Sequence, residues 1–349
     1  MIRAGQFGLG LLAGLGLAIA VAFAAAAGEA PAFAKWFRYD ADLEAAWQVS
    51  EVPGDPLQVM VHHKQEDSWS GRPKVLVLYP RPSSAYDIAI SKILHVFDAR
   101  EVAADITVIN FQIDDALGEA ALKLAQADKY QLIFAMGSES TAWLYRHYRN
   151  GAIPVVSVCS KDPVQLGQVA DYDHGSGTNF AFTSLNMPID VQMAYVRELR
   201  PDLRNLAVLV DNKNISAVQT QAEPIADYAR RRGVQVIWGA VDNPNSAAQE
   251  LAAIVHNAVQ TMRKNDPDLS KSLFWITGST SVFRQIRVIN DNADRVPVVS
   301  VVPEVVTAGA DTAVLAIGIS FESNAHLSAI YGADILQRRA KVSELKVGI

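Results

Sequence analysis

Polar residues that could bind a small molecule follow an apolar run near the middle of the chain. Residues 153–158 are rich in β-branched side chains, which is typical of a strand buried on both faces. Ser160, Lys161 and Asp162 follow in a short turn that ends at Pro163. Because a proline biases the preceding residue to an extended backbone, Pro163 limits the directions open to the Asp162 carboxylate.

Hydroxyl, amide or carboxylate side chains also follow other strand-like runs. Open α/β sheets bind ligands at the carboxyl ends of their strands, so we expect these side chains to line one cleft. Helix N-termini at that edge bind carboxylates or phosphates through backbone N–H groups. The simpler alternative is that each serine only caps its own helix. The predicted ligand-binding residues are Ser83, Ser84, Ser138, Thr141, Ser160, Asp162, Asn212, Ser279, Thr280 and Glu304.

The two halves of the chain have different expected tasks in this cleft. The first half would hold one end of the ligand with hydroxyl and backbone N–H groups, and Asp162 would accept a hydrogen bond from an ammonium or hydroxyl group. The hydroxyls expected for this task are those of Ser83, Ser138 and Ser160. The residues expected to close from the second half are Asn212, Ser279 and Glu304.

Catalytic and metal-binding patterns are absent from the sequence. Residues 136–140 lack the second glycine of a nucleophile elbow, and there is no phosphate-binding loop or His-Glu-x-x-His pattern. The adjacent pair His62 and His63 makes a poor chelate, because neighbouring side chains on a strand point to opposite faces. We therefore predict a protein that is not an enzyme, with no catalytic residue, no cofactor and no metal site.

The cysteine content and the net charge exclude further kinds of site and partner. Cys159 is the only cysteine, which excludes an intramolecular disulfide and a multi-cysteine metal site. It ends an apolar run, so we expect a packing role rather than a nucleophile. The net charge of −6 is spread along the chain without a basic stripe, which argues against nucleic acid as a partner.

The first 34 residues are typical of an export signal. Arg3 supplies the positive charge, residues 9–27 form an apolar run, and small residues in an Ala-x-Ala pattern follow. The run is rich in alanine and glycine, so we expect cleavage and a periplasmic protein. An uncleaved inner-membrane anchor is the alternative, because about 20 apolar residues span a bilayer.

Strand-like and helix-like segments alternate from Pro73 onward, as in βαβ units with parallel sheets. Strands are expected at 74–79, 106–111, 131–135, 153–158, 205–210, 234–239, 272–277, 296–302 and 313–319. Helices are expected at 85–97, 117–127, 139–148, 188–199, 216–232, 247–263, 282–293 and 324–339. This order predicts an α/β protein of two doubly wound parallel-sheet lobes with a hinge and a central cleft.

The expected domain boundaries follow from this alternation. We assign 1–34 to the export signal or anchor and 35–72 to an N-terminal extension that packs on the first lobe or stays partly mobile. The N-terminal lobe is expected to comprise 73–183 plus 318–342, and the C-terminal lobe 184–317 plus 343–349.

An ordered set of short segments resembles the ABC-transporter substrate-binding proteins of the tryptophan/tyrosine type. Residues 153–156 (Ile-Pro-Val-Val) with 162–164 (Asp-Pro-Val) resemble one family segment, and 199–209 resemble the next. Further similar segments lie at 231–234, 308–310, 333–336 and 342–345. The resemblance covers the chain from about Pro73 to its end, and it depends on the ordered set rather than on any single motif.

The resemblance implies a type I periplasmic-binding-protein fold, in which two lobes close on a small solute and hand it to a membrane permease. It implies hinge crossings near 182–185 and 317–321 and in the C-terminal tail. We expect an amino-acid-like solute, an ABC transporter permease as partner and a monomer. The alternatives are a ligand-sensing periplasmic module tethered to the membrane or a partner and, less favoured, a two-lobed α/β enzyme. The loops at 137–140 and 211–214 and the extension 35–72 depart from the family pattern, so ligand identity does not carry over.

Overall fold

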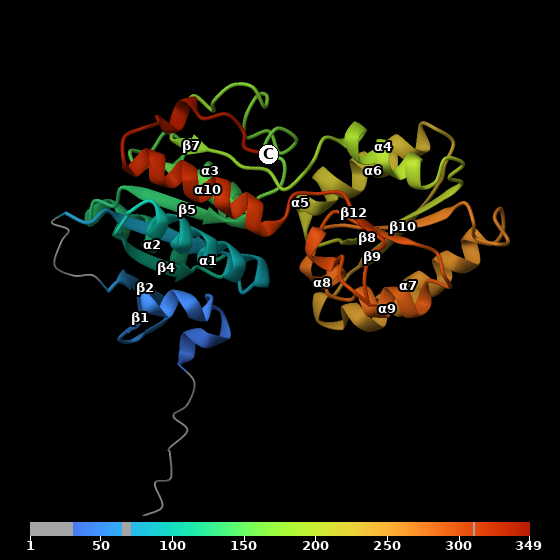
Figure 1. The fold of residues 1–349 in the computed structure, drawn as a ribbon, viewed down its shortest axis with the longest axis horizontal. Helices are drawn as coiled ribbons and strands as arrows, with labels where there is room; N and C mark the ends of the chain where they lie inside the picture. Colours follow the sequence, from blue (N-terminus) through green and yellow to red (C-terminus); the bar gives the residue numbers. More distant parts are fainter. Residues whose placement is uncertain (1–30, 65–70, 310) are drawn as a thin grey trace, which may run out of the picture. The chain divides into compact units, whose positions relative to one another are not determined.

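The structure is a computed structural model that describes residues 31–64, 71–309 and 311–349. Most of the predicted export segment, residues 1–30, therefore lies outside the described residues. From Ala32 to Ile349 the chain forms one compact unit that contains two β-sheets (Figure 1). None of the helices in the described ranges is long and apolar enough to cross a bilayer.

The first sheet has seven strands in the order β1-β2-β4-β3-β5-β6-β7. Their bounds are β1 Trp47–Val52, β2 Asp55–His63, β3 Lys74–Tyr79, β4 Asp105–Asn110, β5 Leu132–Met136, β6 Val155–Val158 and β7 Phe180–Ala181. Strands β4, β3, β5, β6 and β7 pair in parallel, as the alternation predicts. This sheet and the helices that cover it are called the N-terminal lobe below.

Alternating side chains of one strand explain how helices come to cover both faces of this sheet. Val75 and Val77 of β3 belong to a buried cluster that also contains side chains of α1 (Ser84–Ala99) and α10 (Phe321–Leu336). Leu76 and Leu78 belong to a second cluster with α2 (Asp115–Ala127) and α3 (Gly137–Tyr148). A strand that is apolar at every position is thus buried on both sides.

The N-terminal extension adds two strands that the sequence analysis did not predict. β1 and β2 form an antiparallel hairpin, and β2 pairs antiparallel with β4 through contacts such as Val61 opposite Ile106. Ahead of the hairpin, Trp36 and Phe37 pack their rings against Tyr79 of β3. The described part of the extension is therefore built into the sheet, and of the two expected states it takes the packed one.

The second sheet has five strands in the order β12-β11-β10-β8-β9, all parallel. The strands are β8 Asn205–Asp211, β9 Gln235–Val241, β10 Ser272–Ile276, β11 Val298–Ser300 and β12 Leu315–Ala316. The helices around it are α4 Ile189–Leu199, α5 Ile215–Ala217, α6 Glu223–Arg230, α7 Ala247–Met262, α8 Thr280–Phe283 and α9 Ile286–Asn292. We call this part the C-terminal lobe (Figure 1).

Two predicted helices of the C-terminal lobe are interrupted in the structure. The helix expected at 216–232 consists of α5, a π-helical turn at Val218–Ala222 and α6, with Pro224 in the first turn of α6. The π-helical turn, in which the Glu223 N–H bonds to the Val218 carbonyl five residues earlier, directly precedes the proline, which has no N–H to donate. The helix expected at 282–293 is likewise divided into α8 and α9.

The crossings between the lobes contact one another. Ile319 on the return segment donates its backbone N–H to the Leu185 carbonyl at 3.3 Å, and the Thr183 hydroxyl donates to Asn324 Oδ1 at 3.0 Å. Asn186 and Gln221 continue this contact toward the second sheet, because Gln221 Nε2 donates to Asn186 Oδ1 at 3.0 Å. Buried polar contacts of this kind define where the two lobes are joined.

The C-terminal tail packs differently from our expectation. We placed 343–349 in the C-terminal lobe, but Gly348 bridges Thr183 and Val347 lies in the buried cluster of α2 and α3. Ser343 also accepts a backbone hydrogen bond from Gly177 at 3.0 Å. The tail therefore follows the N-terminal lobe, because its apolar side chain finds a buried site on that sheet rather than on the second.

Candidate functional site

A cavity of about 340 Å³ lies between the two lobes, at the carboxyl ends of strands from both sheets. Loops after β3, β5 and β6 approach it from the N-terminal lobe, and loops after β8 and β10 approach it from the other. Its polar and charged lining comprises Arg81, Ser83, Tyr86, Ser138, Glu139, Lys161, Asp211, Asn214, Thr280, Ser281, Arg284 and Gln285. This is the edge at which parallel α/β sheets bind ligands.

Lys161 enters the cavity from the turn after β6. Its side chain is only 7 % exposed. The turn begins at Cys159, whose φ of 52° lies in the left-handed region, and the Lys161 backbone N–H donates to Ser138 Oγ at 3.0 Å. Burial lowers the pKa of Lys161, while the charge of Glu139 opposes this shift and that of Arg81 adds to it. In the described part of the chain, no acceptor forms a hydrogen bond or ion pair with the Lys161 ammonium.

Arg81 and Glu139, which both line the cavity, form an ion pair. Arg81 follows β3, and Glu139 lies in the first turn of α3. The Glu139 carboxylate is thus paired with Arg81, and it forms no direct ion pair with Lys161. Two cations and one carboxylate consequently face the cavity from the N-terminal lobe.

Gly137 allows α3 to start directly beside Tyr86. Its φ is +74°, and a Cβ at this position would lie 2.0 Å from the Tyr86 hydroxyl oxygen. A side chain is therefore excluded on both conformational and steric grounds. The close approach places the Tyr86 hydroxyl at the beginning of α3, next to the cavity.

Asp211 ends β8 and faces the cavity from the C-terminal lobe. Its Oδ2 accepts from the Ser281 hydroxyl at 2.6 Å, and its Oδ1 accepts from the Lys213 backbone N–H at 2.8 Å. Arg284 lines the same side with an exposed side chain. The C-terminal lobe thus also presents both signs of charge.

Three of the predicted site residues line the cavity, namely Ser83, Ser138 and Thr280. The Ser83 hydroxyl accepts from the Ala85 backbone N–H at 3.3 Å, so it caps α1 as well. Ser138 was expected to cap α3, but it lies inside the helix, and Met136 is the N-cap. Their roles toward a ligand remain predictions.

The other predicted residues make contacts within the protein and do not line this cavity; they are Ser84, Thr141, Ser160, Asp162, Asn212, Ser279 and Glu304. Asp162 turns back into its own loop, where it accepts from the backbone N–H groups of Val164 at 2.9 Å and Gln165 at 3.1 Å and from the Tyr172 hydroxyl. Its carboxylate is therefore engaged by the turn rather than aimed at the cavity.

The remaining six do not line the cavity either. Thr141 Oγ1 donates to the Gly137 carbonyl at 2.8 Å, and Asn212 Nδ2 donates to Asp242 at 2.8 Å. Ser160 and Ser279 are buried, and Ser84 lies in the first turn of α1. Glu304 accepts from the Phe321 backbone N–H at 2.6 Å and borders a different cavity.

The sequence analysis did not assign a ligand role to the charged residues of the cavity, Arg81, Glu139, Lys161, Asp211 and Arg284. Arg81, Glu139, Lys161 and Asp211 lie shortly after the ends of predicted strands. This position was the available signal in the sequence that they could face a ligand. Charged residues in turns are usually solvated, so nothing in the sequence alone separates a solvated charge from one that faces a cleft.

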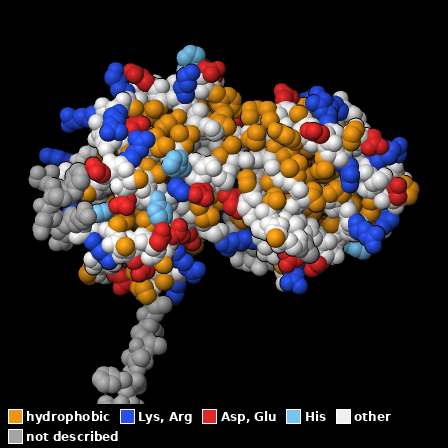
Figure 2. Space-filling model, in the orientation of Figure 1, with side chains coloured by type: hydrophobic (Ala, Val, Ile, Leu, Met, Phe, Trp, Pro, Cys, Tyr) orange, Lys and Arg blue, Asp and Glu red, His pale blue; other side chains and the backbone are white. Residues whose placement is uncertain are grey.

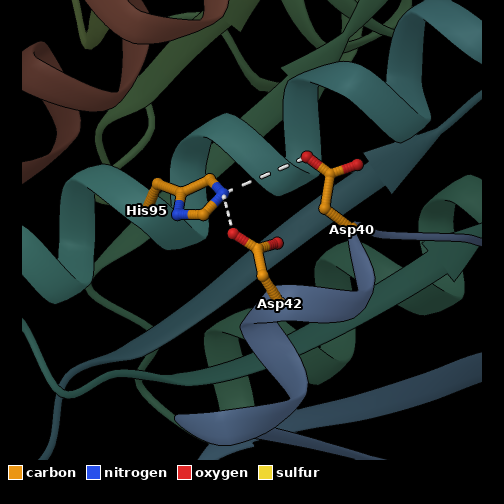
Figure 3. A group of neighbouring side chains, drawn as sticks. All are labelled: Asp40, Asp42 and His95. Atoms are coloured by element: carbon orange, nitrogen blue, oxygen red, sulfur yellow. Dashed lines mark ion pairs between the residues drawn. The ribbon is translucent and has the colours of Figure 1, made fainter.

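A separate group of side chains lies outside this cavity, over α1. Nε2 of His95 is 3.6 Å from Asp42 and 4.0 Å from Asp40 (Figure 3). Figure 2 shows histidine and acidic side chains over α1 and α10 on this face. The three groups lie close enough to approach one cation, but the aspartates are exposed, and as they stand they are ion pairs between the N-terminal extension and α1.

Residues 96–346 match the family described as ABC transporter substrate binding protein. The chain belongs to this family. No curated protein matches the sequence. The match begins within α1 and includes the C-terminal lobe and most of the N-terminal lobe, whereas Arg81, Ser83 and Tyr86 of the cavity precede it.

Solved structures give the same fold at low sequence identity. A conserved domain protein from Vibrio cholerae aligns with a TM-score of 0.60 and 16 % identity, over 79 % of this chain and 88 % of the other. A Streptococcus pneumoniae ABC domain in complex with L-Trp aligns with a TM-score of 0.59 and 16 % identity, over 79 % of this chain and 88 % of the other. The ligand-free, open form of a Clostridium difficile substrate-binding protein with adhesive properties aligns with a TM-score of 0.54 and 18 % identity. This alignment covers 79 % of this chain and 88 % of the other. This substrate-binding protein therefore has the type I periplasmic-binding-protein fold.

Proposed function

We propose that this protein captures a small solute between its two lobes after export and delivers it to an ABC transporter permease in the inner membrane. The single observation that carries the proposal is the cavity of about 340 Å³ at the strand ends of both lobes. Small-molecule sites have volumes of roughly 300–1,000 Å³, so this cavity suits a solute of amino-acid size. Membership of a substrate-binding family supports the same role.

The polar character of the lining favours an amino-acid-like solute. Hydroxyls and cations face the cavity from the N-terminal lobe, and Asp211 faces it from the C-terminal lobe. A zwitterion presents a carboxylate and an ammonium group, which match these two kinds of partner. The similar Streptococcus pneumoniae domain was solved with L-Trp, which supports this class without identifying the ligand here.

Solute capture would act through the crossings between the lobes. A ligand that contacts residues of both lobes favours the closed state by the contacts that exist only there. The buried bonds of Thr183 with Asn324 and of Asn186 with Gln221 would hold the crossings while the lobes move. We propose that the protein acts as a monomer in this cycle.

The first test is native mass spectrometry of the mature protein, purified without denaturation, followed by extraction of any bound solute. A monomer that carries one small solute, released on unfolding, is the expected result. Small-angle scattering with and without that solute should show compaction. A protein that carries nothing and whose scattering and thermal midpoint ignore amino acids, sugars and organic acids would contradict the proposal.

Localisation separates delivery from the sensing alternative. Cleavage of the export signal would leave a soluble periplasmic protein that can shuttle to a permease. The expected result is that the periplasmic fraction contains a chain starting near residue 35. An intact N-terminus recovered with inner membranes would favour the tethered sensor instead.

A further inference from the structure

Lys161 is a buried cation that borders the cavity without a counter-ion. It is more than nine-tenths buried, and in the described ranges its ammonium has neither a hydrogen bond nor an ion pair. Lysines are almost never buried in this way unless they are paired, because removing an ammonium from water is costly. The Lys161 ammonium therefore lacks a negatively charged partner among the described residues.

The nearby carboxylates are already engaged. Glu139 is paired with Arg81, and Asp211 across the cavity accepts hydrogen bonds from Ser281 and from the Lys213 backbone. The N-terminal side of the cavity, with Arg81, Glu139 and Lys161, consequently carries one uncompensated positive charge. A ligand group that sits beside Lys161 gains most if it is negative.

Hydrogen-bond donors lie on the same side of the cavity as Lys161. The Ser138 hydroxyl oxygen accepts from the Lys161 backbone N–H at 3.0 Å and from the Ser160 hydroxyl at 3.5 Å, so its own proton can be donated elsewhere. The Tyr86 hydroxyl lines the cavity and forms no hydrogen bond with the described residues. The first-turn N–H groups of α3, a helix of 12 residues, have no side-chain cap. Such a helix start favours negative charge.

We infer that Lys161 binds an anionic group of the solute, with the Tyr86 and Ser138 hydroxyls as further donors. The inference rests on the proposed solute-binding function and specifies its ligand class as small organic acids or phosphorylated compounds. Lys161 then determines affinity for the charged form of the ligand. Neutral solutes of the same shape bind weakly, because they leave the ammonium buried and unpaired.

Matched acid and amide probes test this inference by isothermal titration calorimetry. The probes are L-tryptophan with L-tryptophanamide, succinate with succinamide, inorganic phosphate and neutral myo-inositol. Wild type is expected to bind at least one acid about tenfold or more tightly than its amide, because a charge-assisted hydrogen bond is lost in the amide. Binding of phosphate rather than the carboxylates would identify a phosphorylated ligand, and the reverse a carboxylic acid.

Two variants separate a ligand role from a structural one. Lys161→Met should lower affinity for the acid about tenfold or more and leave the amide unchanged. Without ligand it should unfold at the same temperature as wild type or a higher one, since it removes an unpaired buried charge. Lys264→Met, at an exposed lysine in the turn after α7, should change neither property.

The outcomes also distinguish this inference from the proposed function. An amide or myo-inositol that binds wild type as tightly as any acid would overturn the anion site but keep a solute-binding protein. So would a neutral solute that co-purifies, or a Lys161→Met variant that keeps wild-type affinity for the acid. A protein that neither binds nor carries any solute would contradict both.

Discussion

Asn324 in α10 accepts a hydrogen bond on its Oδ1 from the backbone N–H of Cys159 at 2.8 Å. The two residues are 165 positions apart in the chain. The same oxygen accepts from the Thr183 hydroxyl at 3.0 Å. One buried amide therefore joins the turn that presents Lys161 to the crossing between the lobes. The turn needs this support, because Cys159 has a positive φ that costs free energy in a residue other than glycine.

Removing the Asn324 side chain should weaken both the fold and the site. In Asn324→Ala the buried Cys159 backbone N–H loses its acceptor, at a cost of about 1–3 kcal/mol, whereas the Thr183 hydroxyl keeps the Ser157 carbonyl at 2.9 Å. We expect the free energy of unfolding in urea to fall by about 1–3 kcal/mol and solute affinity to fall with it. Asn324→Asp keeps the acceptor oxygen and should retain more stability than the alanine variant. Equal stability of Asn324→Ala and wild type would contradict this role of Asn324.

Gly137→Ala should disrupt the start of α3. The variant adds a Cβ at φ +74°, 2.0 Å from the Tyr86 hydroxyl oxygen. The left-handed backbone alone costs roughly 1–2 kcal/mol, and the steric clash adds to it. Gly167→Ala is a matched control, because Gly167 has φ +68° and nothing within 4 Å of a built Cβ. Urea unfolding of both should show the larger loss at Gly137, and similar losses would show that Tyr86 gives way.

Solute affinity should depend on pH through Lys161. Burial holds the pKa of Lys161 below its ordinary value, and a bound anion would raise it. Affinity is therefore constant while free Lys161 is charged and falls as the pH rises through its lowered pKa, by up to about tenfold per pH unit. Titrations between pH 6 and 10 with an acid that has no amine should show this fall.

The neighbours of Lys161 do not produce the same pH profile. Arg81 stays charged, because its pKa is raised, and burial raises the pKa of both Tyr86 and Cys159, so both remain protonated. Glu139 and Asp211 are the carboxylates that line this cavity. Lys161→Met should therefore give a flat profile, and a profile unchanged by the substitution would contradict the assignment.

Asp162 should prove to be a residue of its turn rather than a direct ligand contact. Asp162→Ala leaves the N–H groups of Val164 and Gln165 and the Tyr172 hydroxyl without their acceptor. We expect a loss of about 1–3 kcal/mol in the free energy of unfolding. Asp162→Asn keeps one acceptor oxygen and should bind the solute nearly as wild type does. Loss of binding in Asp162→Asn at unchanged stability would restore the ligand role that the sequence suggested.

Hydrophobic periodicity alone determined most of the fold. Runs such as Val75 to Leu78 are apolar at every position, which is typical of a strand covered on both faces, and the helices between them favour parallel crossovers. The hairpin of β1 and β2 was missed because it joins the sheet by antiparallel pairing at one edge and only some of its residues are buried. The tail could not be placed either, since its docking beside Thr183 depends on a surface made by distant segments.

The sequence also located the edge of the sheets where the cavity lies, because strand ends are visible in the pattern. It could not choose which side chain of each turn faces the cavity. Lys161 and Asp162 are adjacent, yet one borders the cavity and the other is held by its own loop. Backbone dihedral angles and the distant Asn324 decide between them, and both arise only when α10 packs beside β6. A sequence pattern records the types of residues, whereas the direction of a side chain depends on contacts between segments far apart in the chain.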